Sequence, residues 1–113
     1  MNEIQKYISK NESKMLEDLF SLIRIPSISA KPEHHDDMLA CAERWAQLLI
    51  EAGADEALVM PSKGNPIVFG QKTVDPTAKT VLIYAHYDVM PAEPLEPVSY
   101  THLRAHETSP DIV

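Results

Sequence analysis

The stretch TVLIYA, residues 80–85, is a continuous run of mainly apolar residues, several of them β-branched or aromatic. Such a run predicts a β-strand that is buried on both faces of a sheet. His86 and Asp88 follow directly, in HYDVMP, residues 86–91. If the strand continues through Asp88, its two-residue period places both side chains on the same side. The carboxyl end of a central strand is a common position for functional sites in α/β proteins.

A first helix is expected well before this strand. Apolar residues recur at helical spacing over residues 11–24, with Asn11 or Ser13 as candidate caps and Pro26 beyond the end. Apolar residues nearer the start of the chain could extend the same face backwards: Ile4, Tyr7 and Ile8.

A second helix is predicted over residues 32–52, with Gly53 as its terminator. Short strands are then expected at residues 57–60 and 67–70, joined by a turn-rich link. Two helices followed by strands, one of them deeply buried, predict an α/β layer structure.

The composition excludes several classes of function. The 113 residues are 44% hydrophobic and 24% charged, as in soluble globular proteins. A formal charge of −7 and the lack of a basic stripe argue against a nucleic-acid partner. No apolar run is long enough to span a bilayer, and the start lacks the apolar core of a secretory signal, so no membrane partner is expected. The single cysteine, Cys41, fits a reducing compartment, and a cytoplasmic location is therefore expected.

His86 and Asp88 have the chemistry of a metal ligand and its orienting partner. A neutral imidazole is a good zinc ligand, and a nearby carboxylate fixes its tautomer and raises its basicity. The alternative is a structural His–Asp pair that closes the end of a strand. One histidine and one aspartate cannot complete a tetrahedral zinc site, so spacing alone leaves both interpretations open.

The wider string resembles the zinc-dependent dipeptidases of the family that includes carnosinase, aminoacylase and acetylornithine deacetylase. That branch typically reads Gly-His-Tyr-Asp-Val-Gln-Pro, then Ala, an acidic residue, Pro, Leu and an acidic residue. Ala85 replaces the usual Gly and Met90 the usual Gln. The matching residues are His86, Tyr87, Asp88, Val89, Pro91, Ala92, Glu93, Pro94, Leu95 and Glu96. Upstream, the segment Leu22–Ser29 resembles the family's sequence after its first helix.

The resemblance implies that residues 1–96 are the incomplete amino-terminal part of a zinc-peptidase catalytic domain, with two helices and then strands of a mixed sheet. It implies hydrolysis of dipeptides or related amide bonds by a two-metal zinc centre, on a small peptide substrate. His86 would ligate one zinc, and Asp88 would belong to the catalytic machinery by orienting His86. The full-length enzyme could be a homodimer.

The family's other metal ligands and its general base come later than residue 96, so this chain alone is expected to be inactive. Two alternatives remain open at this point. One is an N-acyl amino acid deacylase of the same family, and the other is a short, non-catalytic α/β binding module.

Residues 98–108 read as VSYTHLRAHET, which resembles a translated transposase-type sequencing-library adapter. The authentic protein is therefore expected to end at Glu96, with residues 97–113 as a non-native read-through tail. The i,i+4 pair His102 and His106 has the spacing of a helical zinc pair, and the adapter resemblance removes it as a functional candidate.

Three other features are given structural explanations. The cluster His34-His35-Asp36-Asp37 could suggest a metal clamp, but its acids are explained by the dipole of a helix start. Cys41 is expected to be a buried, inert thiol and Trp45 a core residue, because both lie on the apolar stripe of the second helix.

Overall fold

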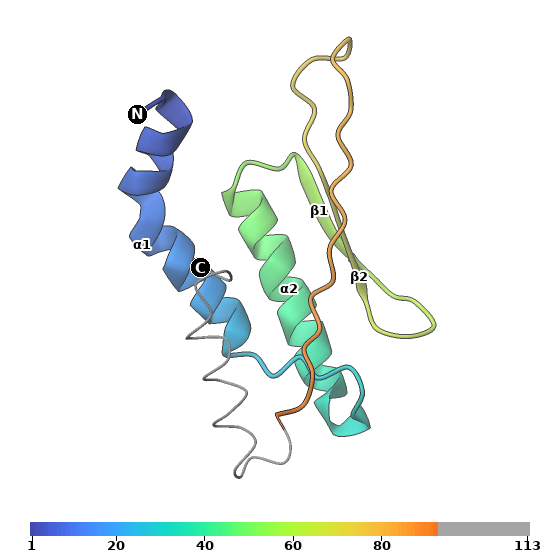
Figure 1. The fold of residues 1–113 in the computed structure, drawn as a ribbon. Coiled ribbons are helices and arrows are strands. Elements are labelled where there is room, and N and C mark those ends of the chain that lie inside the picture. Colours follow the sequence, from blue (N-terminus) through green and yellow to red (C-terminus); the bar gives the residue numbers. More distant parts are fainter. Residues whose placement is uncertain (93–113) are drawn as a thin grey trace.

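The computed structural model describes residues 1–92, in which two helices precede a β-hairpin (Figure 1). The predicted end at Glu96, the tail at residues 97–113 and the pair His102 and His106 lie outside the described residues. The elements are helix α1 (Glu3–Ile23), a short 3-10 helix (Pro32–His34), helix α2 (His35–Glu51), and strands β1 (Glu56–Met60) and β2 (Ile67–Gln71). The described part of the chain is therefore an α/β arrangement, as expected.

Helix α1 begins earlier than residues 11–13, and the assignment of Asn11 or Ser13 as its cap is wrong. The Asn2 side chain accepts a hydrogen bond from the Gln5 N–H at 2.8 Å, and the Gln5 side chain accepts one from the Asn2 N–H at 2.9 Å. This capping box satisfies two backbone donors that a helix start otherwise leaves unpaired. The first turns of α1 contain Ile4, Tyr7 and Ile8, so these residues extend the same helix backwards, as expected.

Helix α2 confirms the prediction for residues 32–52. Pro32 lies in the 3-10 turn that leads into the helix, and Asp36 and Asp37 occupy the first turn of α2, where the helix dipole favours negative charge. Gly53 ends the helix with a φ of 104°, a left-handed conformation that glycine adopts without a steric penalty.

Strands β1 and β2 also confirm their predicted positions. They pair antiparallel with Leu58 opposite Phe69, and both strands pack against α2. Gly70 lies so close to the helix that an added Cβ would be 2.9 Å from Leu49 Cδ1. The buried hydrophobic residues within residues 1–92 all belong to α2: Met38, Cys41 and Ala42.

The prediction of a buried strand at residues 80–85 is wrong for the described structure. This segment runs as an extended chain that joins no sheet (Figure 1). Val81 is 80% exposed and Leu82 90% exposed. A strand is stabilised by a hydrogen-bonded neighbour, and the sheet within residues 1–92 contains β1 and β2 alone. The apolar sequence is therefore present without the partner strands that would bury it.

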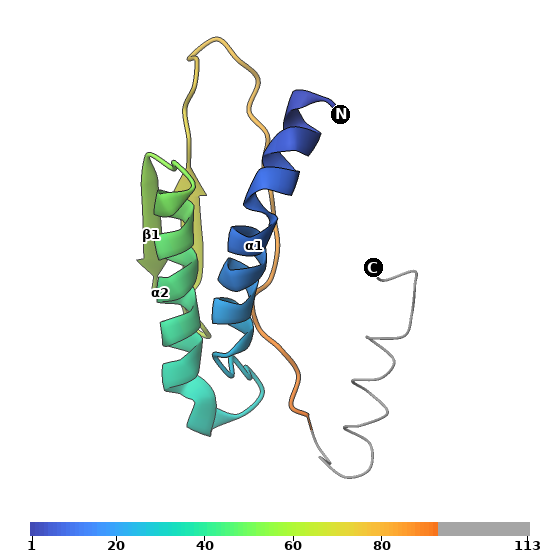
Figure 2. The same ribbon diagram turned by 90° about the vertical axis from the view of Figure 1, so that its left-hand side faces the viewer.

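Helix α1 also presents apolar side chains to solvent. It packs against α2 through few contacts, and from the side it stands apart from the hairpin (Figure 2). Its exposed large hydrophobic residues include Ile4, Tyr7, Ile8, Met15, Leu16, Leu19, Phe20 and Ile23. Neither helix within residues 1–92 combines the length and the apolarity that crossing a bilayer requires.

Candidate metal-binding site

The segment that follows α1 holds residues 87–89 in place. Ile28 and Val89 form an isolated parallel bridge, and the Val89 N–H donates to the Ser27 carbonyl at 2.9 Å. The Ser27 hydroxyl donates to the Tyr87 carbonyl at 3.0 Å, and Ser27 is only 1% exposed. These bonds hold residues that are about sixty positions apart in sequence side by side. His86 directly precedes the held residues 87–89 and Asp88 lies among them, so the same bonds position both side chains.

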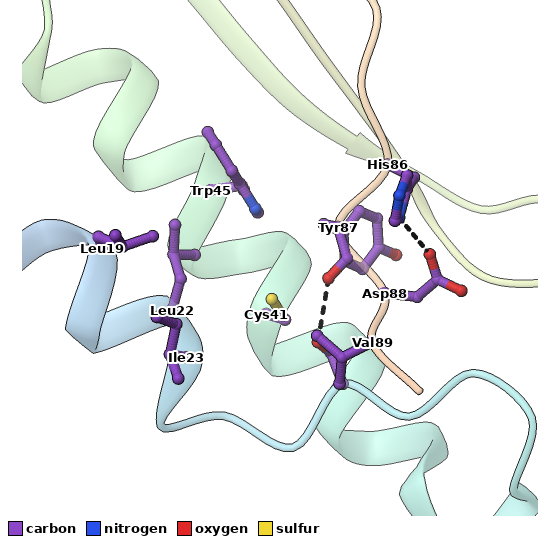
Figure 3. A pocket seen from close by; sticks show the side chains of 10 residues that line it. Leu19, Leu22, Ile23, Cys41, Trp45, His86, Tyr87, Asp88 and Val89 are labelled. Carbon is purple, nitrogen blue, oxygen red and sulfur yellow. Dashed lines mark hydrogen bonds and ion pairs between the residues drawn. The ribbon is translucent and has the colours of Figure 1, made fainter. Parts of the chain in front are cut away.

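His86 and Asp88 meet directly, with His86 Nδ1 2.8 Å from Asp88 Oδ1 (Figure 3). The second carboxylate oxygen, Oδ2, accepts a hydrogen bond from the Ser29 hydroxyl at 2.6 Å. Asp88 is therefore bonded on both oxygens, by an imidazole from its own segment and a hydroxyl from the segment after α1. The two side chains come together although their segment joins no sheet.

The electrostatics of this array determine which imidazole nitrogen carries the proton. Hydrogen bonds from the Ser29 hydroxyl and from His86 lower the pKa of the Asp88 carboxyl below its usual value. An ionised carboxylate is an acceptor only, so Nδ1 of His86 must be the donor in their hydrogen bond. In the neutral imidazole, Nε2 then carries the lone pair. Nε2 has no recorded partner within residues 1–92, and the His86 side chain is 79% exposed.

A hollow of about 180 Å³ lies beside this array, between α1, α2 and residues 86–89 (Figure 3). Its lining includes Leu22, Cys41, Trp45 and Tyr87. Cys41 is 1% exposed, and burial raises the pKa of its thiol, which supports the predicted inert cysteine. Trp45 was expected to be a core residue. It is only half-buried, and it lines the wall of this hollow.

Tyr87 fixes the same segment from the opposite direction. Its hydroxyl donates to the Pro66 carbonyl at 2.6 Å, in the link between β1 and β2. Burial raises the pKa of the Tyr87 phenol, which therefore stays protonated as a donor at neutral pH. The backbone of Tyr87 is thus tied to the end of α1 and its side chain to the hairpin.

The donor set fits one metal ligand with its orienting partner. His86 offers an exposed Nε2 lone pair, and a hydrogen-bonded carboxylate behind Nδ1 is the usual second partner of a metal-binding histidine. No group of three His, Cys, Asp or Glu side chains within residues 1–92 could hold a metal ion together. A complete site would need ligands beyond those residues.

The second candidate cluster lies at the start of α2, where His34 is the N-cap residue but makes no side-chain cap hydrogen bond. His34 Nδ1 lies 2.8 Å from Asp37 Oδ2, a carboxylate of the first turn. Asp36 and Asp37 lie in that first turn, where the helix dipole favours negative charge. Within residues 1–92, no third side chain joins the pair as a candidate metal ligand.

Sequence reasoning did not identify Ser27 and Ser29 as site residues. Neither serine has a motif spacing to His86 or Asp88, since Ser29 is 59 positions from Asp88. The sequence offered one indication of their importance, the resemblance of Leu22–Ser29 to a family segment. That resemblance does not indicate what the serine hydroxyls contact.

Comparison with known proteins places the chain near one class, the metallodipeptidases. It is 29% identical over 105 residues to the Cys-Gly metallodipeptidase dug1 of Schizosaccharomyces pombe, a match that covers 81% of this chain and 21% of that protein. It is 30% identical over 86 residues to the cysteinylglycine-S-conjugate dipeptidase of Corynebacterium striatum, covering 76% of this chain and 19% of that protein. The chain spans about a fifth of the length of these curated relatives. No family model and no solved structure matches it.

Proposed function

We propose that residues 1–96 form the amino-terminal part of the catalytic domain of a zinc metallodipeptidase. The observation that carries this proposal is the His86–Asp88–Ser29 array, which holds the imidazole by Nδ1 and leaves Nε2 available. The similarity to two metallodipeptidases supports the class of enzyme.

Each residue of the array has a distinct role in this proposal. His86 binds one zinc ion through Nε2. Asp88 fixes the tautomer and the rotation of the imidazole, and Ser29 holds the carboxylate in position from the other side. A two-zinc centre, when bound, supplies an activated water and polarises the amide carbonyl. The remaining ligands and the general base lie outside residues 1–96, so the 113-residue chain by itself is inactive.

The proposed substrates are small peptides, with dipeptides of the cysteinylglycine type as the first to test. Both relatives carry names that refer to such dipeptides. A deacylase would instead prefer N-acyl amino acids, so comparing hydrolysis rates on cysteinylglycine and on an N-acetyl amino acid separates the two activities.

We further propose that residues 97–113 are not part of this domain, because the sequence of residues 98–108 resembles a translated library adapter. The genomic DNA downstream of codon 96 tests this. A reading frame that continues into further carboxylate and histidine motifs supports the proposal. Codons at 98–108 that differ from the adapter, followed by a genuine stop, would contradict it and favour a short binding module.

The decisive experiment uses the enzyme encoded by that continued reading frame. His86→Ala is expected to lower the bound zinc and abolish dipeptide hydrolysis. Asp88→Ala is expected to lower metal affinity or activity by about 10–100-fold, since it removes only the orienting partner. His34→Ala is a matched control, because His34 also bonds an aspartate at 2.8 Å but lies at the start of α2. Full zinc content and activity in His86→Ala would refute the proposal.

A further inference from the structure

Residues 80–85 are an extended segment without a partner. Its four central side chains are 80–90% exposed: Val81, Leu82, Ile83 and Tyr84. Neighbouring residues of an extended chain point to opposite faces, so both faces of the segment are bare. No backbone–backbone hydrogen bond within residues 1–92 involves residues 80–86. Among the described residues, neither edge of the segment has a backbone partner for its N–H and C=O groups.

We propose that residues 80–85 pair antiparallel with the same segment in further copies of this chain. The sequence TVLIYA combines β-branched and aromatic residues with no proline, no glycine and no charge. Six-residue segments of this composition form tight interfaces with identical segments when they are exposed. An unpaired edge is the position where such pairing begins.

The charges that flank the segment determine the direction of pairing. Lys79 precedes it, Asp88 follows it, and residues 80–87 carry no Asp, Glu, Lys or Arg. Antiparallel pairing brings Lys79 of each copy toward the end where the other copy has Asp88. Parallel in-register pairing would instead stack each Lys79 about 4.8 Å from another Lys79. Charge complementarity therefore selects the antiparallel arrangement.

The size of the contact indicates how far the assembly extends. A stable protein interface covers roughly 800 Å² on each partner, and one ladder of six residues is too short to supply this area. Pairing on one edge leaves the second edge of each segment exposed. Further copies can therefore add on both sides, and the products are oligomers larger than dimers.

Sedimentation velocity on the 113-residue chain over a wide range of concentrations tests the proposal. The wild type is expected to form concentration-dependent oligomers. Leu82→Lys and Ile83→Lys are each expected to raise the concentration at which oligomers appear by about tenfold or more, because each places a charged side chain in an apolar ladder, as native edge strands do to prevent pairing. Both side chains are exposed, so neither substitution removes packing from α2 or the hairpin.

Val74→Lys is the matched control, since Val74 is also apolar and 86% exposed but lies outside the segment. It is expected to leave the oligomers unchanged. A monomeric wild type, or an equal effect of Val74→Lys, overturns the proposal. Loss of oligomers in Tyr7→Lys with no effect of Ile83→Lys also overturns it, because the contact surface would then be α1.

Spin labels test the direction of pairing. A label at an Ile83→Cys position is expected to couple strongly between copies, because residue 83 lies near the middle of the stretch from Lys79 to Asp88. A label at a Thr80→Cys position is expected to couple weakly in antiparallel pairs. Equally strong coupling at both positions would indicate parallel stacking and would overturn the antiparallel arrangement.

Discussion

The Asp88 carboxylate determines which imidazole nitrogen of His86 carries the proton, through a single hydrogen bond. Because the carboxylate is ionised, its contact at 2.8 Å requires a proton on Nδ1. The neutral imidazole is therefore expected to be the Nδ1–H tautomer, with Nε2 as the metal-binding atom. The hydrogen bond that favours this tautomer is made entirely by residues of the described chain.

We predict that Asp88→Ala abolishes the tautomer preference of His86. Imidazole ¹⁵N chemical shifts report the two nitrogens separately, and in the wild type they are expected to show protonated Nδ1 in the neutral ring. Asp37→Ala is the control, because it removes the same type of partner from His34 alone. An unchanged His86 spectrum in Asp88→Ala would show that the carboxylate does not set the tautomer.

Asp55 gives the hairpin a pH-dependent contact. It accepts hydrogen bonds from the Thr73 N–H at 2.8 Å and from the Lys72 ammonium at 3.3 Å. These bonds lower the pKa of the Asp55 carboxyl below its ordinary value, the Thr73 N–H contributing most. A lowered folded-state pKa stabilises the fold above the unfolded-state value of about 3.9, and the stabilisation disappears as the pH falls through the folded-state pKa.

In the domain encoded by the continued reading frame, we predict that the Thr73 amide chemical shift follows the titration of the Asp55 carboxyl, with a midpoint below about 3.9. Asp55→Asn is expected to remove this transition and the accompanying loss of hairpin order at low pH. Asp75→Asn serves as the control, since Asp75 bonds Thr77 within its own turn. A Thr73 midpoint at or above the ordinary aspartate value would contradict the assigned contact.

At the residue scale, the sequence predicted that His86 and Asp88 lie on one side, and it did not show that two serines support them. His86 and Asp88 were predictable because two positions along an extended chain define one side. Ser27 and Ser29 were not, because their contacts depend on how the end of α1 lies against residues 87–89. That arrangement is a property of the tertiary structure and leaves no spacing signal.

At the element scale, the connection after α1 acts as a clamp on residues 87–89. Ser27 is buried and contributes its hydroxyl to the Tyr87 carbonyl and its own carbonyl to the Val89 N–H. Removing the hydroxyl leaves a half-buried carbonyl without its donor, which costs about 1–3 kcal/mol.

Limited proteolysis of a dilute sample measures this contribution. In the wild type, chymotrypsin is expected to cut after the 90% exposed Tyr84 faster than after the half-buried Tyr87. Ser27→Ala is expected to speed cleavage after Tyr87, so that the ratio of the Tyr84 rate to the Tyr87 rate falls by about tenfold. Cleavage after Tyr84 is the internal control, and Ser13→Ala, at an exposed position of α1, should leave the ratio of the two rates unchanged. An unchanged ratio in Ser27→Ala would contradict the clamp.

The elements that form by local rules were predictable, and those that need distant partners were not. Helix α2 has a complete set of local signals, from Pro32 to Gly53, and the hairpin strands are bounded by clear turns. The start of α1 was misplaced because polar residues around Asn11 resemble a cap, although the Asn2 capping box lies further upstream. Residues 80–85 have strand composition, but pairing requires neighbours that composition cannot specify.

At the scale of the whole molecule, the described chain buries little apolar surface. Within residues 1–92 three hydrophobic residues are buried, while the large side chains of α1 and of residues 80–84 face solvent. Burial of apolar area is the main favourable contribution to folding, so the stability of the described structure is expected to be low.

We predict that the isolated chain is poorly stable, with a broad thermal transition, poorly dispersed amide spectra and a tendency to precipitate. Far-ultraviolet circular dichroism during heating, together with amide NMR spectra, provides the measurement. The domain encoded by the continued reading frame is the comparison and is expected to unfold sharply. A cooperative transition with sharp, dispersed spectra for the isolated chain would contradict this prediction.

We also predict that the 113-residue chain, purified and loaded with zinc, does not hydrolyse dipeptides. A single histidine ligand cannot hold a two-metal centre, and no further metal-binding group occurs within residues 1–92. The assay measures cysteinylglycine hydrolysis at saturating zinc, with the complete enzyme as the positive control. Dipeptidase activity of the purified, zinc-loaded chain would contradict this prediction, and persistence of that activity in His86→Ala would show that His86 is not required for it.

The clamp around residues 87–89 has a consequence for biosynthesis. Chains leave the ribosome amino end first, and Ser27 and Ser29, which hold residues 87–89, precede His86 by about sixty positions. The β1–β2 link that receives the Tyr87 hydroxyl has also been translated before Tyr87 emerges. The imidazole can therefore adopt its orientation once residues 86–89 have left the exit tunnel, before the later part of the polypeptide has emerged from the ribosome.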